Sequence, residues 1–489
     1  MSRKKLDFRA DAYRNVLGFT FRHWSGRLPL VTVICVLVIA STLAEVMVPV
    51  FSGQIVDAIA GGSSGAAAGA LRAFAIVVGL GLTSVVLRWF IFQGVIRLTI
   101  RMMADLVNDG FYRVQRFSTD WHANSFAGST VRKITRGMWA LDLLNDTLLV
   151  ALFPSAVMLL GATVILGWNW PLMGLVVGIG SIIFIGVTVS LSVGFVAPAA
   201  TLANAWDTRL GGVLADAVSC NPVVKAFGAE LREEERLTRV VDKWRHRTRR
   251  TWRRGTFNGG VQGMMMVVMQ TSILGVVIYL WQNGLASAGD MTFVLTMFFV
   301  LGGHLNDVGM HIRNLQRSIN DMEELVGLYS QPLGIEDKPG AKHVRIGKGE
   351  IAFENVTFRY GAHATPLYRN FSVRIRAGER VGLVGHSGSG KTTFVKLIQR
   401  LYDVNGGAIT IDGVNIADVQ QASLRSQIAI VQQEPVLFHR SLAENIAYAR
   451  PDATRAEIIE AAKLASAHEF IEELPKGYET LVGERGVKL

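Results

Sequence analysis

The stretch TLLVALFPSAVMLLGATVILGWNWPLMGLVVGIGSIIFIGVTVSLSVGFVAPAATLANAW, residues 147–206, contains no Asp, Glu, Lys or Arg in sixty positions. A membrane-spanning helix needs ~20 mostly apolar residues, so this stretch is too long for one helix and long enough for two. Trp168-Asn169-Trp170-Pro171 lies near its middle, and proline favours the first turn of a helix. The stretch therefore predicts a helical hairpin inside a bilayer.

Four further apolar stretches flank this hairpin, at about residues 28–51, 70–96, 259–281 and 291–312. Each is long enough to cross the hydrocarbon core, so the sequence predicts six spans. Half of the residues are hydrophobic and 18% are charged, which excludes a disordered chain. The chain has only two cysteines, which excludes a disulfide-rich scaffold.

Basic residues alternate between the segments that join the spans. Lys and Arg number seven in residues 1–27, seven in 97–147 and twelve in 200–255. The alternate segments at 52–69, 167–171 and 282–290 contain none. Basic loops stay on the cytoplasmic side, so we expect a multi-pass protein of the cell membrane, of the bacterial inner-membrane type, with both termini cytoplasmic.

The net charge of +11 is concentrated in the same half of the chain. Residues 1–330 hold 30 Lys and Arg against 21 Asp and Glu, a balance of +9. This excess marks cytoplasmic loops, and the run Arg245-His246-Arg247-Thr248-Arg249-Arg250 is expected to lie near anionic lipid headgroups. We expect membrane lipids as partners and no nucleic acid.

The two long basic segments are predicted to continue the membrane helices into the cytoplasm. A helix rises ~1.5 Å per residue, so arms of about 20 residues would reach roughly 30 Å. Ordinary solvated loops are the alternative. The segment at 200–255 favours rigid arms because its only helix-breaking pairs are Gly211-Gly212 and Asn221-Pro222.

Four ionisable residues fall within the predicted spans: Glu45, Arg88, His304 and Asp307. Charged groups are costly in lipid, so we expect these side chains to face a cavity or one another. A substrate pathway, a structural pair between helices and a position near the headgroups are all compatible with this pattern.

The chain after the sixth span has a different character. The expected divisions are a leader at 1–27, a membrane domain at 28–315, a linker at 316–348 and a soluble domain at 349–489. Alternating apolar residues in 351–360 and 371–375 predict strands. Arg380-Val381-Gly382-Leu383-Val384 is predicted as a buried strand, and a helix is predicted from Thr392 to Tyr402.

Gly385-His386-Ser387-Gly388-Ser389-Gly390-Lys391-Thr392 joins these two elements and fits the phosphate-binding pattern G-x-x-x-x-G-K-[ST]. The three glycines let the backbone fold so that its N–H groups point at phosphate oxygens. Lys391 supplies a cation for the terminal phosphates, and the Thr392 hydroxyl is a ligand suited to Mg²⁺. A glycine-rich structural turn is the alternative.

Six spans joined to a phosphate-loop domain resemble an ATP-binding-cassette (ABC) exporter half-transporter of the multidrug or lipid-exporter type. In that family an aromatic residue before the loop stacks on adenine, and Tyr360 in Val356–Tyr360 matches it, a packed strand aromatic being the alternative. Gln433 in Ile430–Phe438 resembles the glutamine that contacts Mg²⁺ and water, with Gln432 as the second choice. The residues implied to bind ATP and Mg²⁺ are Tyr360, Gly385, His386, Ser387, Gly388, Ser389, Gly390, Lys391, Thr392, Thr393 and Gln433, with Thr392 and Gln433 on the metal.

The resemblance extends to segments that couple the two domains of such exporters. Residues 215–230 look like the second coupling segment, and residues 116–136 occupy the position of the first. Residues 480–486 are similar to the segment that contacts the membrane arms. The fold class implied is a membrane α-helical domain with six spans and long arms, plus an α/β phosphate-loop domain incomplete at its C-terminus.

The family's signature Leu-Ser-Gly-Gly-Gln, its second acidic strand motif, its catalytic glutamate and its switch histidine are not found up to Leu489. Phosphoryl transfer requires a group that orients the attacking water, so no catalytic residue is assigned and ATP binding without hydrolysis is expected. We also expect the reading frame to continue past Leu489, because helices predicted at 441–449 and 454–474 would cover a larger parallel sheet.

The function implied is ATP-driven export of a small apolar or amphipathic substrate by one half of a homodimeric or heterodimeric transporter. The alternatives are a non-hydrolysing nucleotide-binding membrane subunit and an inactive truncated fragment. The identity of the substrate is left open.

Overall fold

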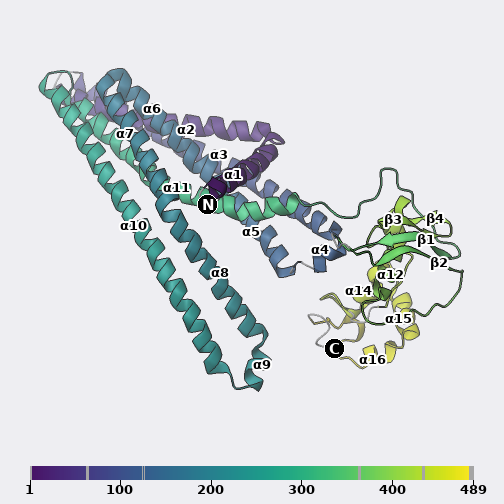
Figure 1. Cartoon of the computed structure of the whole chain (residues 1–489). Helices are drawn as coiled ribbons and strands as arrows, with labels where there is room; N and C mark the ends of the chain where they lie inside the picture. Colours follow the sequence, from purple (N-terminus) through teal and green to yellow (C-terminus); the bar gives the residue numbers. More distant parts are fainter. Residues whose placement is uncertain are drawn as a thin grey trace. The chain divides into compact units, whose positions relative to one another are not determined.

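The computed structural model of the chain describes residues 3–61, 65–123, 125, 127–361, 365–431 and 436–483. It divides into two compact units. The first comprises Met1–Gln115 and Ser125–Gln331, and the second comprises Arg116–Asn124 and Pro332–Leu489. The first unit is helical, and the second contains the β-sheet (Figure 1).

Among the described residues, six helical segments are long and apolar enough to cross a membrane, as predicted. Four are single α-helices: α2 (Leu28–Ala60), α3 (Ala66–Arg116), α10 (Glu230–Gln282) and α11 (Ala288–Tyr329). Two pass through a π-helical turn: α5 (Ala127–Asn145), η1 (Asp146–Leu152) and α6 (Phe153–Asn169), then α7 (Pro171–Ser190), η2 (Leu191–Val196) and α8 (Ala197–Ser219). The first unit also contains the shorter helices α1 (Arg3–Ser25) and α9 (Asn221–Ala226), and α4 (Thr119–Ala123) belongs to the second unit.

The predicted hairpin break in residues 147–206 is confirmed. Trp170 leaves the helix with φ −141° and ψ 104°, and Pro171 occupies the first turn of α7. The Trp170 indole N–H donates to the Leu285 carbonyl oxygen at 3.3 Å, so Trp170 also contacts the turn between α10 and α11. Proline lacks the N–H that would be unpaired at a helix start, which is why the second helix begins there.

The C-terminal end of α2 and the start of α11 approach each other at two glycines. A Cβ at Gly53 would lie 2.6 Å from the carbonyl oxygen of Gly289, so the two backbones touch without side chains between them. The Asp57 carboxylate accepts hydrogen bonds from the Ser287 hydroxyl and the Gly289 N–H, each at 2.8 Å. This carboxylate therefore satisfies N–H and O–H donors at the start of α11, where a negative charge is favourable.

The long arms predicted from the basic segments are continuous helices. Helix α10 runs without interruption for 53 residues and lies beside α8 (Figure 1). The Arg254 guanidinium donates to the Phe195 carbonyl oxygen at 2.8 Å and lies over the Phe195 ring. Further along, Arg209 of α8 and Lys243 of α10 both lie over the Trp206 ring, at 5.1 and 5.4 Å from its centroid. The contacts made by Arg254 and Lys243 run from α10 to Phe195 and Trp206, and so join the two arms.

The second unit is built on an antiparallel sheet of strand order β2-β1-β3-β4. Its strands are β1 (Ile351–Phe358), β2 (Tyr368–Ile375), β3 (Gly406–Ile411) and β4 (Val414–Asn415). The buried face of the sheet packs on α12 (Lys391–Ile398), where the Phe353 and Phe394 rings stack at 4.5 Å. The strands predicted from alternating apolar residues are confirmed, and α12 ends four residues before the predicted Tyr402.

The prediction of a buried strand at 380–384 is wrong. This segment forms no strand, and Val384 is 94% exposed. The apolar segment at 428–431 is likewise not a strand, and Val431 is 98% exposed. A strand needs a partner for its N–H and C=O groups, and no described segment pairs with either stretch.

Short helices complete the second unit. Their bounds are η3 (Ile416–Asp418), α13 (Gln421–Arg425), α14 (Leu442–Ile446), η4 (Ala447–Ala449), α15 (Arg455–Leu464), α16 (His468–Glu472) and η5 (Gly477–Glu479). Capping boxes begin two of these helices, Ser441 with Glu444 at α14 and Thr454 with Glu457 at α15. The single helix predicted over 454–474 is wrong, because the chain turns at Ser466, whose φ is +55°. A left-handed residue cannot continue an α-helix.

Candidate functional site

The glycine-rich loop lies between the sheet and α12, and its backbone needs glycine at three positions. Gly385, Gly388 and Gly390 have φ values of +149°, +83° and +99°, in the region that L side chains rarely adopt. A Cβ at Gly390 would also lie 2.9 Å from the Tyr368 hydroxyl oxygen. The loop is therefore shaped for close approach of a ligand to its backbone, as its glycine spacing predicts.

Lys391 begins α12 and folds back over this loop. Its ammonium donates to the Gly385 carbonyl oxygen at 2.8 Å, to the His386 carbonyl oxygen at 2.9 Å and to the Ser389 hydroxyl at 3.4 Å. The positive charge thus sits beside the N-terminal end of α12, where backbone N–H groups have no helical partner. A cation and free N–H groups at one place form a site that suits a phosphate group.

Two neighbouring threonines after Lys391 lie in different surroundings. Thr392 is exposed at the loop, whereas Thr393 is buried and its hydroxyl is 2.7 Å from the Tyr360 hydroxyl oxygen. Of the residues predicted to contact nucleotide, Thr393 therefore faces Tyr360 rather than solvent. The predicted metal ligand Gln433 and its alternative Gln432 lie outside the described residues.

Tyr360 is held beside the loop by aromatic neighbours. Its ring meets Phe358 and Tyr402 edge-on, with centroid distances of 4.9 and 5.1 Å. The Tyr402 hydroxyl in turn donates to the Asp120 carboxylate at 2.7 Å, and Asp120 lies in Arg116–Asn124, the short part of the membrane half of the sequence that belongs to this unit. Burial and the Asp120 carboxylate raise the pKa of Tyr402 to about 12, which keeps its phenol neutral at physiological pH.

Two residues of this cluster were not predicted from the sequence. Tyr368 donates its hydroxyl to the Gly390 carbonyl oxygen at 2.8 Å and so fixes the last turn of the loop. Asp120 reaches Tyr402 from a segment 282 residues away in the chain. Neither residue belongs to a sequence motif. Only the alternation of apolar residues in β2 could have indicated that Tyr368 faces α12.

Replacing Tyr360 with alanine is expected to weaken ATP binding by about 1–3 kcal/mol, the range found when an aromatic platform for a base is removed. The Tyr360→Phe variant keeps the ring and loses only the hydrogen bond to Thr393, so its affinity should stay within a few-fold of the parent. Titration of a fluorescent ATP analogue into the full chain measures both. Equal losses in the two variants would assign the effect to the Tyr360 hydroxyl and its hydrogen bond to Thr393, and not to stacking of the ring on the base.

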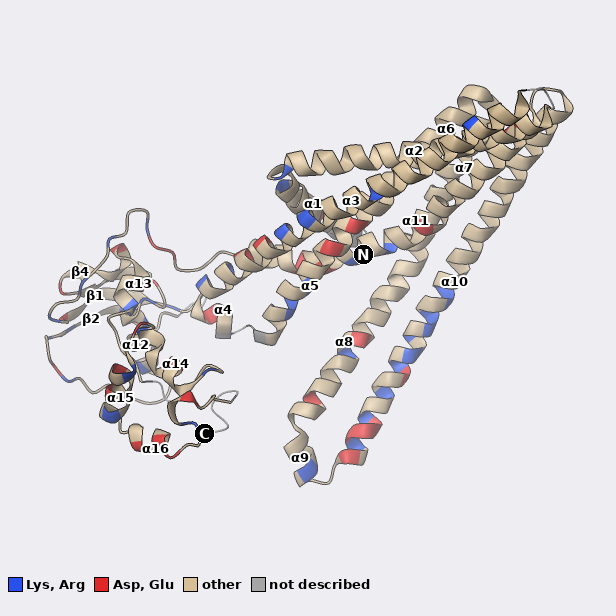
Figure 2. Ribbon diagram, turned by 180° about the vertical axis from the view of Figure 1, so that it is seen from behind, with Lys and Arg blue, Asp and Glu red and all other residues tan. Residues whose placement is uncertain are grey.

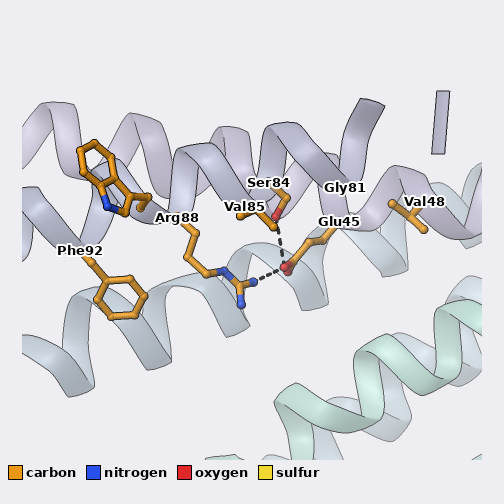
Figure 3. Close-up of a pocket in the computed structure, with 8 residues that line it drawn as sticks. Glu45, Val48, Gly81, Ser84, Val85, Arg88 and Phe92 are labelled. Atoms are coloured by element: carbon orange, nitrogen blue, oxygen red, sulfur yellow. Dashed lines mark hydrogen bonds and ion pairs between the residues drawn. The ribbon is translucent and has the colours of Figure 1, made fainter. Parts of the chain in front are cut away.

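A second candidate site is a pocket in the first unit, between α2 and α3 (Figure 3). Its volume is about 420 Å³, which lies within the range of small-molecule sites. Most of its wall is apolar, and Phe92 lies at one end of the residues drawn in Figure 3. The full lining is Glu45, Val48, Gly81, Ser84, Val85, Arg88, Trp89 and Phe92.

The polar part of this pocket is a connected network. Arg88 forms an ion pair with the Glu45 carboxylate, which also accepts from the Ser84 hydroxyl at 3.4 Å. The second Glu45 oxygen is 4.0 Å from Nε2 of His304 on α11, and the other ring nitrogen of His304 is 3.1 Å from the Ser155 hydroxyl on α6. Three of the four ionisable residues in the predicted spans therefore face one another, as their cost in lipid requires.

Comparison with known proteins decides the family. The family description "ABC transporter transmembrane region" matches residues 31–305, and "ABC transporter" matches residues 368–484. The chain belongs to the ABC transporter family. Its membrane region and its ATP-binding-cassette region are fused in one polypeptide, which is the half-transporter arrangement.

Several of the similar proteins are of the Atm1 type. An "ATM1-type heavy metal exporter" of Novosphingobium aromaticivorans is 32% identical over 92% of this chain and 74% of that protein. A mitochondrial "iron-sulfur clusters transporter atm1" of Aspergillus fumigatus is 32% identical over 95% of this chain and 64% of that protein. The structure of a bacterial Atm1-family ABC exporter with ATP bound has a TM-score of 0.81 and 30% identity, covering 95% of this chain and 81% of the other.

Proposed function

We propose that this ABC protein is one half of an ATP-driven exporter of the Atm1 type. The single observation that carries the proposal is the joining, in one chain, of six membrane helices with a loop whose glycines and Lys391 present cation and N–H groups together. Similarity to an Atm1-family exporter over 95% of the chain supports the same function.

The loop residues fit a bound ATP. The backbone of residues 385–390 would surround the phosphates, and the Lys391 ammonium would exchange its two carbonyl partners for phosphate oxygens. The exposed Thr392 hydroxyl would hold Mg²⁺, which bridges phosphate oxygens and neutralises their charge. Tyr360, fixed by Thr393 and Tyr402, would offer its ring to the adenine.

We propose a second half-transporter as the partner, either a second copy of this chain or a related one. ABC exporters place ATP between two cassettes, and closure of the pair on ATP moves the membrane helices through the arms. Such coupling requires that ATP bind the closed pair more tightly than the open pair. The similarity to an Atm1-family exporter solved with ATP supports this arrangement.

The substrate class we propose is a small amphipathic compound. Two relatives have names that include heavy metals, and a compound of this class could contain a bound metal. The pocket of Figure 3 supports an amphipathic occupant, because an apolar aromatic wall adjoins one acid and one base. A heavy metal would then be carried as part of such a compound.

Expression of the protein from its complete gene, together with its partner half where that is a different chain, in a metal-sensitive host tests this function. Cells producing the parent chain should grow at higher cadmium concentrations than cells with an empty vector, and cells producing Lys391→Ala should not. Matched membrane levels of parent and variant, measured by immunoblot, are the control. Equal tolerance in all three strains would contradict Atm1-type export.

The proposed orientation gives a separate prediction. A cysteine placed at residue 285 should react with a membrane-impermeant maleimide in intact cells, because it lies in the uncharged turn between α10 and α11. A cysteine at residue 245 should react only after permeabilisation, because its segment is the most basic one. Labelling of residue 245 in intact cells would reverse the orientation.

A further inference from the structure

A row of arginines on α10 has no partner in the described part of the chain. Arg249, Arg250 and Arg253 are exposed, and no ion pair or hydrogen bond joins their side chains to another described residue. Their basic neighbours differ: Arg245 pairs with Asp242 at 3.0 Å, and Arg254 is bound to Phe195. Part of the basic run is thus used within the fold, and part is left facing outward.

The unpartnered arginines share one face of the helix. Arg249 and Arg253 are four residues apart and Trp252 is three residues from Arg249, so the Arg249 side chain is a neighbour of both. Like charges at this spacing repel, which costs ~0.2–0.5 kcal/mol per pair in an isolated helix. An anion bound between them would remove that cost. Trp252 is 73% exposed, and exposed tryptophans collect at the boundary between lipid and water.

Acidic residues gather at the end of α10 near α9, and basic residues follow further along the helix (Figure 2). Glu230, Glu233, Glu234 and Glu235 occupy its first turns, near α9, and the arginines come later. From Glu235 to Arg249 the helix rises about 21 Å, more than twice the ~8 Å Debye length at physiological salt. The nearest acid of α10, Asp242, pairs with Arg245, and the adjacent α8 offers only Asp207 and Asp216. None of these acids pairs with Arg249 or Arg253 in the described part of the chain.

Beyond the arginines the same helix becomes apolar and outward-facing. Met264, Val267 and Val268 are 66%, 57% and 59% exposed, within the stretch of α10 that is apolar enough to span a bilayer. The predicted span begins near Gly259, so Arg253 lies about 9 Å and Arg249 about 15 Å before it. The uncharged stretch of α10 already begins at Gly255, about 3 Å after Arg253 and about 9 Å after Arg249 along the helix. The headgroup layer extends ~5–7 Å beyond the hydrocarbon core, so Arg253 lies within this layer and the long side chain of Arg249 reaches its outer edge.

We propose that Arg249, Arg253 and Trp252 form a binding site for the phosphate of an anionic phospholipid in the cytoplasmic leaflet. The guanidinium groups bind the phosphate oxygens, and the indole lies among the glycerol and upper acyl groups. The site rests on the cytoplasmic orientation proposed above, which the cysteine-labelling experiment tests separately. Its consequence is a preference for anionic over zwitterionic lipid around this arm.

Lipid bound to the purified full chain tests this site. The detergent-solubilised protein is equilibrated with equal amounts of phosphatidylglycerol and phosphatidylcholine, and the retained lipids are quantified by mass spectrometry. One basic residue near a surface is worth ~1 kcal/mol, about five-fold in binding. Arg249→Gln with Arg253→Gln should therefore lower the preference for phosphatidylglycerol at this site by roughly 30-fold.

A matched control uses arginines of the same helix far from the apolar stretch. Arg236→Gln with Arg239→Gln removes the same charge and should leave the lipid preference unchanged. Arg249→Lys with Arg253→Lys should retain most of it. For the parent chain, raising NaCl to 1 M should reduce the preference, which tests the proposal even where the glutamine variant does not fold. Equal loss in the distal variant, no loss in the glutamine variant or no effect of salt would overturn the site.

Discussion

Replacing Lys391 with alanine is expected to lower the affinity of the chain for ATP by about 100-fold. The ammonium is the cation that the structure places over the loop, within 2.9 Å of two loop carbonyls that phosphate oxygens would displace. Each hydrogen bond to a charged group contributes ~1.5–3 kcal/mol, and ~1.4 kcal/mol is a factor of ten. Two such bonds therefore account for the expected loss, measured by titration of the full chain with a fluorescent ATP analogue.

The nearby Lys396→Ala variant is the matched control. Lys396 lies in the last turn of α12, at the end of the helix away from the loop, so its loss should change affinity by less than two-fold. If Lys391→Ala bound ATP as tightly as the parent chain, residues 385–392 would be a structural turn and not a phosphate site.

Replacing Arg88 with alanine is expected to destabilise the membrane region by about 3 kcal/mol. The change leaves the Glu45 carboxylate, whose side chain is only 25% exposed, without its cation. Removing one partner of a desolvated ion pair costs ~3–5 kcal/mol, because the remaining charge is left uncompensated. Unfolding of the full chain in detergent by increasing amounts of SDS, followed by tryptophan fluorescence, measures the loss.

Removing both charges provides the control for this result. Arg88→Met with Glu45→Gln eliminates the uncompensated charge, so the double variant should be more stable than Arg88→Ala alone. Arg88→Lys keeps the positive charge and should lie close to the parent chain. A double variant as unstable as Arg88→Ala would mean that lost packing, and not the unpaired carboxylate, accounts for the effect.

The helical part of this fold was predictable because its signals are local. The uncharged stretch at 147–206, Pro171 and the alternation of basic segments each act within a few turns of helix, and the structure confirms six spans. The strand prediction at 380–384 failed for the opposite reason. Apolar residues there describe a strand only if a neighbour supplies hydrogen bonds, and a sequence pattern contains no information about that neighbour.

The candidate sites divide in the same way. The loop glycines and Lys391 follow from a contiguous motif, and their backbone conformations agree with it. The contact between Asp120 and Tyr402 joins distant segments and has no sequence signal. The cost of charge in lipid predicted that Glu45 and Arg88 would find partners, but the choice of His304 as the third member depends on how α11 packs against α2.

The glycine contact between α2 and α11 has a consequence for how such chains can diverge. Gly53 and Gly289 each limit the other, since a methyl group on either would meet backbone atoms of its counterpart. A larger residue at one position cannot be compensated by a smaller residue at the other, because no residue is smaller than glycine. Evolutionary drift is therefore blocked at both positions together while the surrounding apolar residues can exchange, and a paired glycine should mark the register of these two helices across distant descendants.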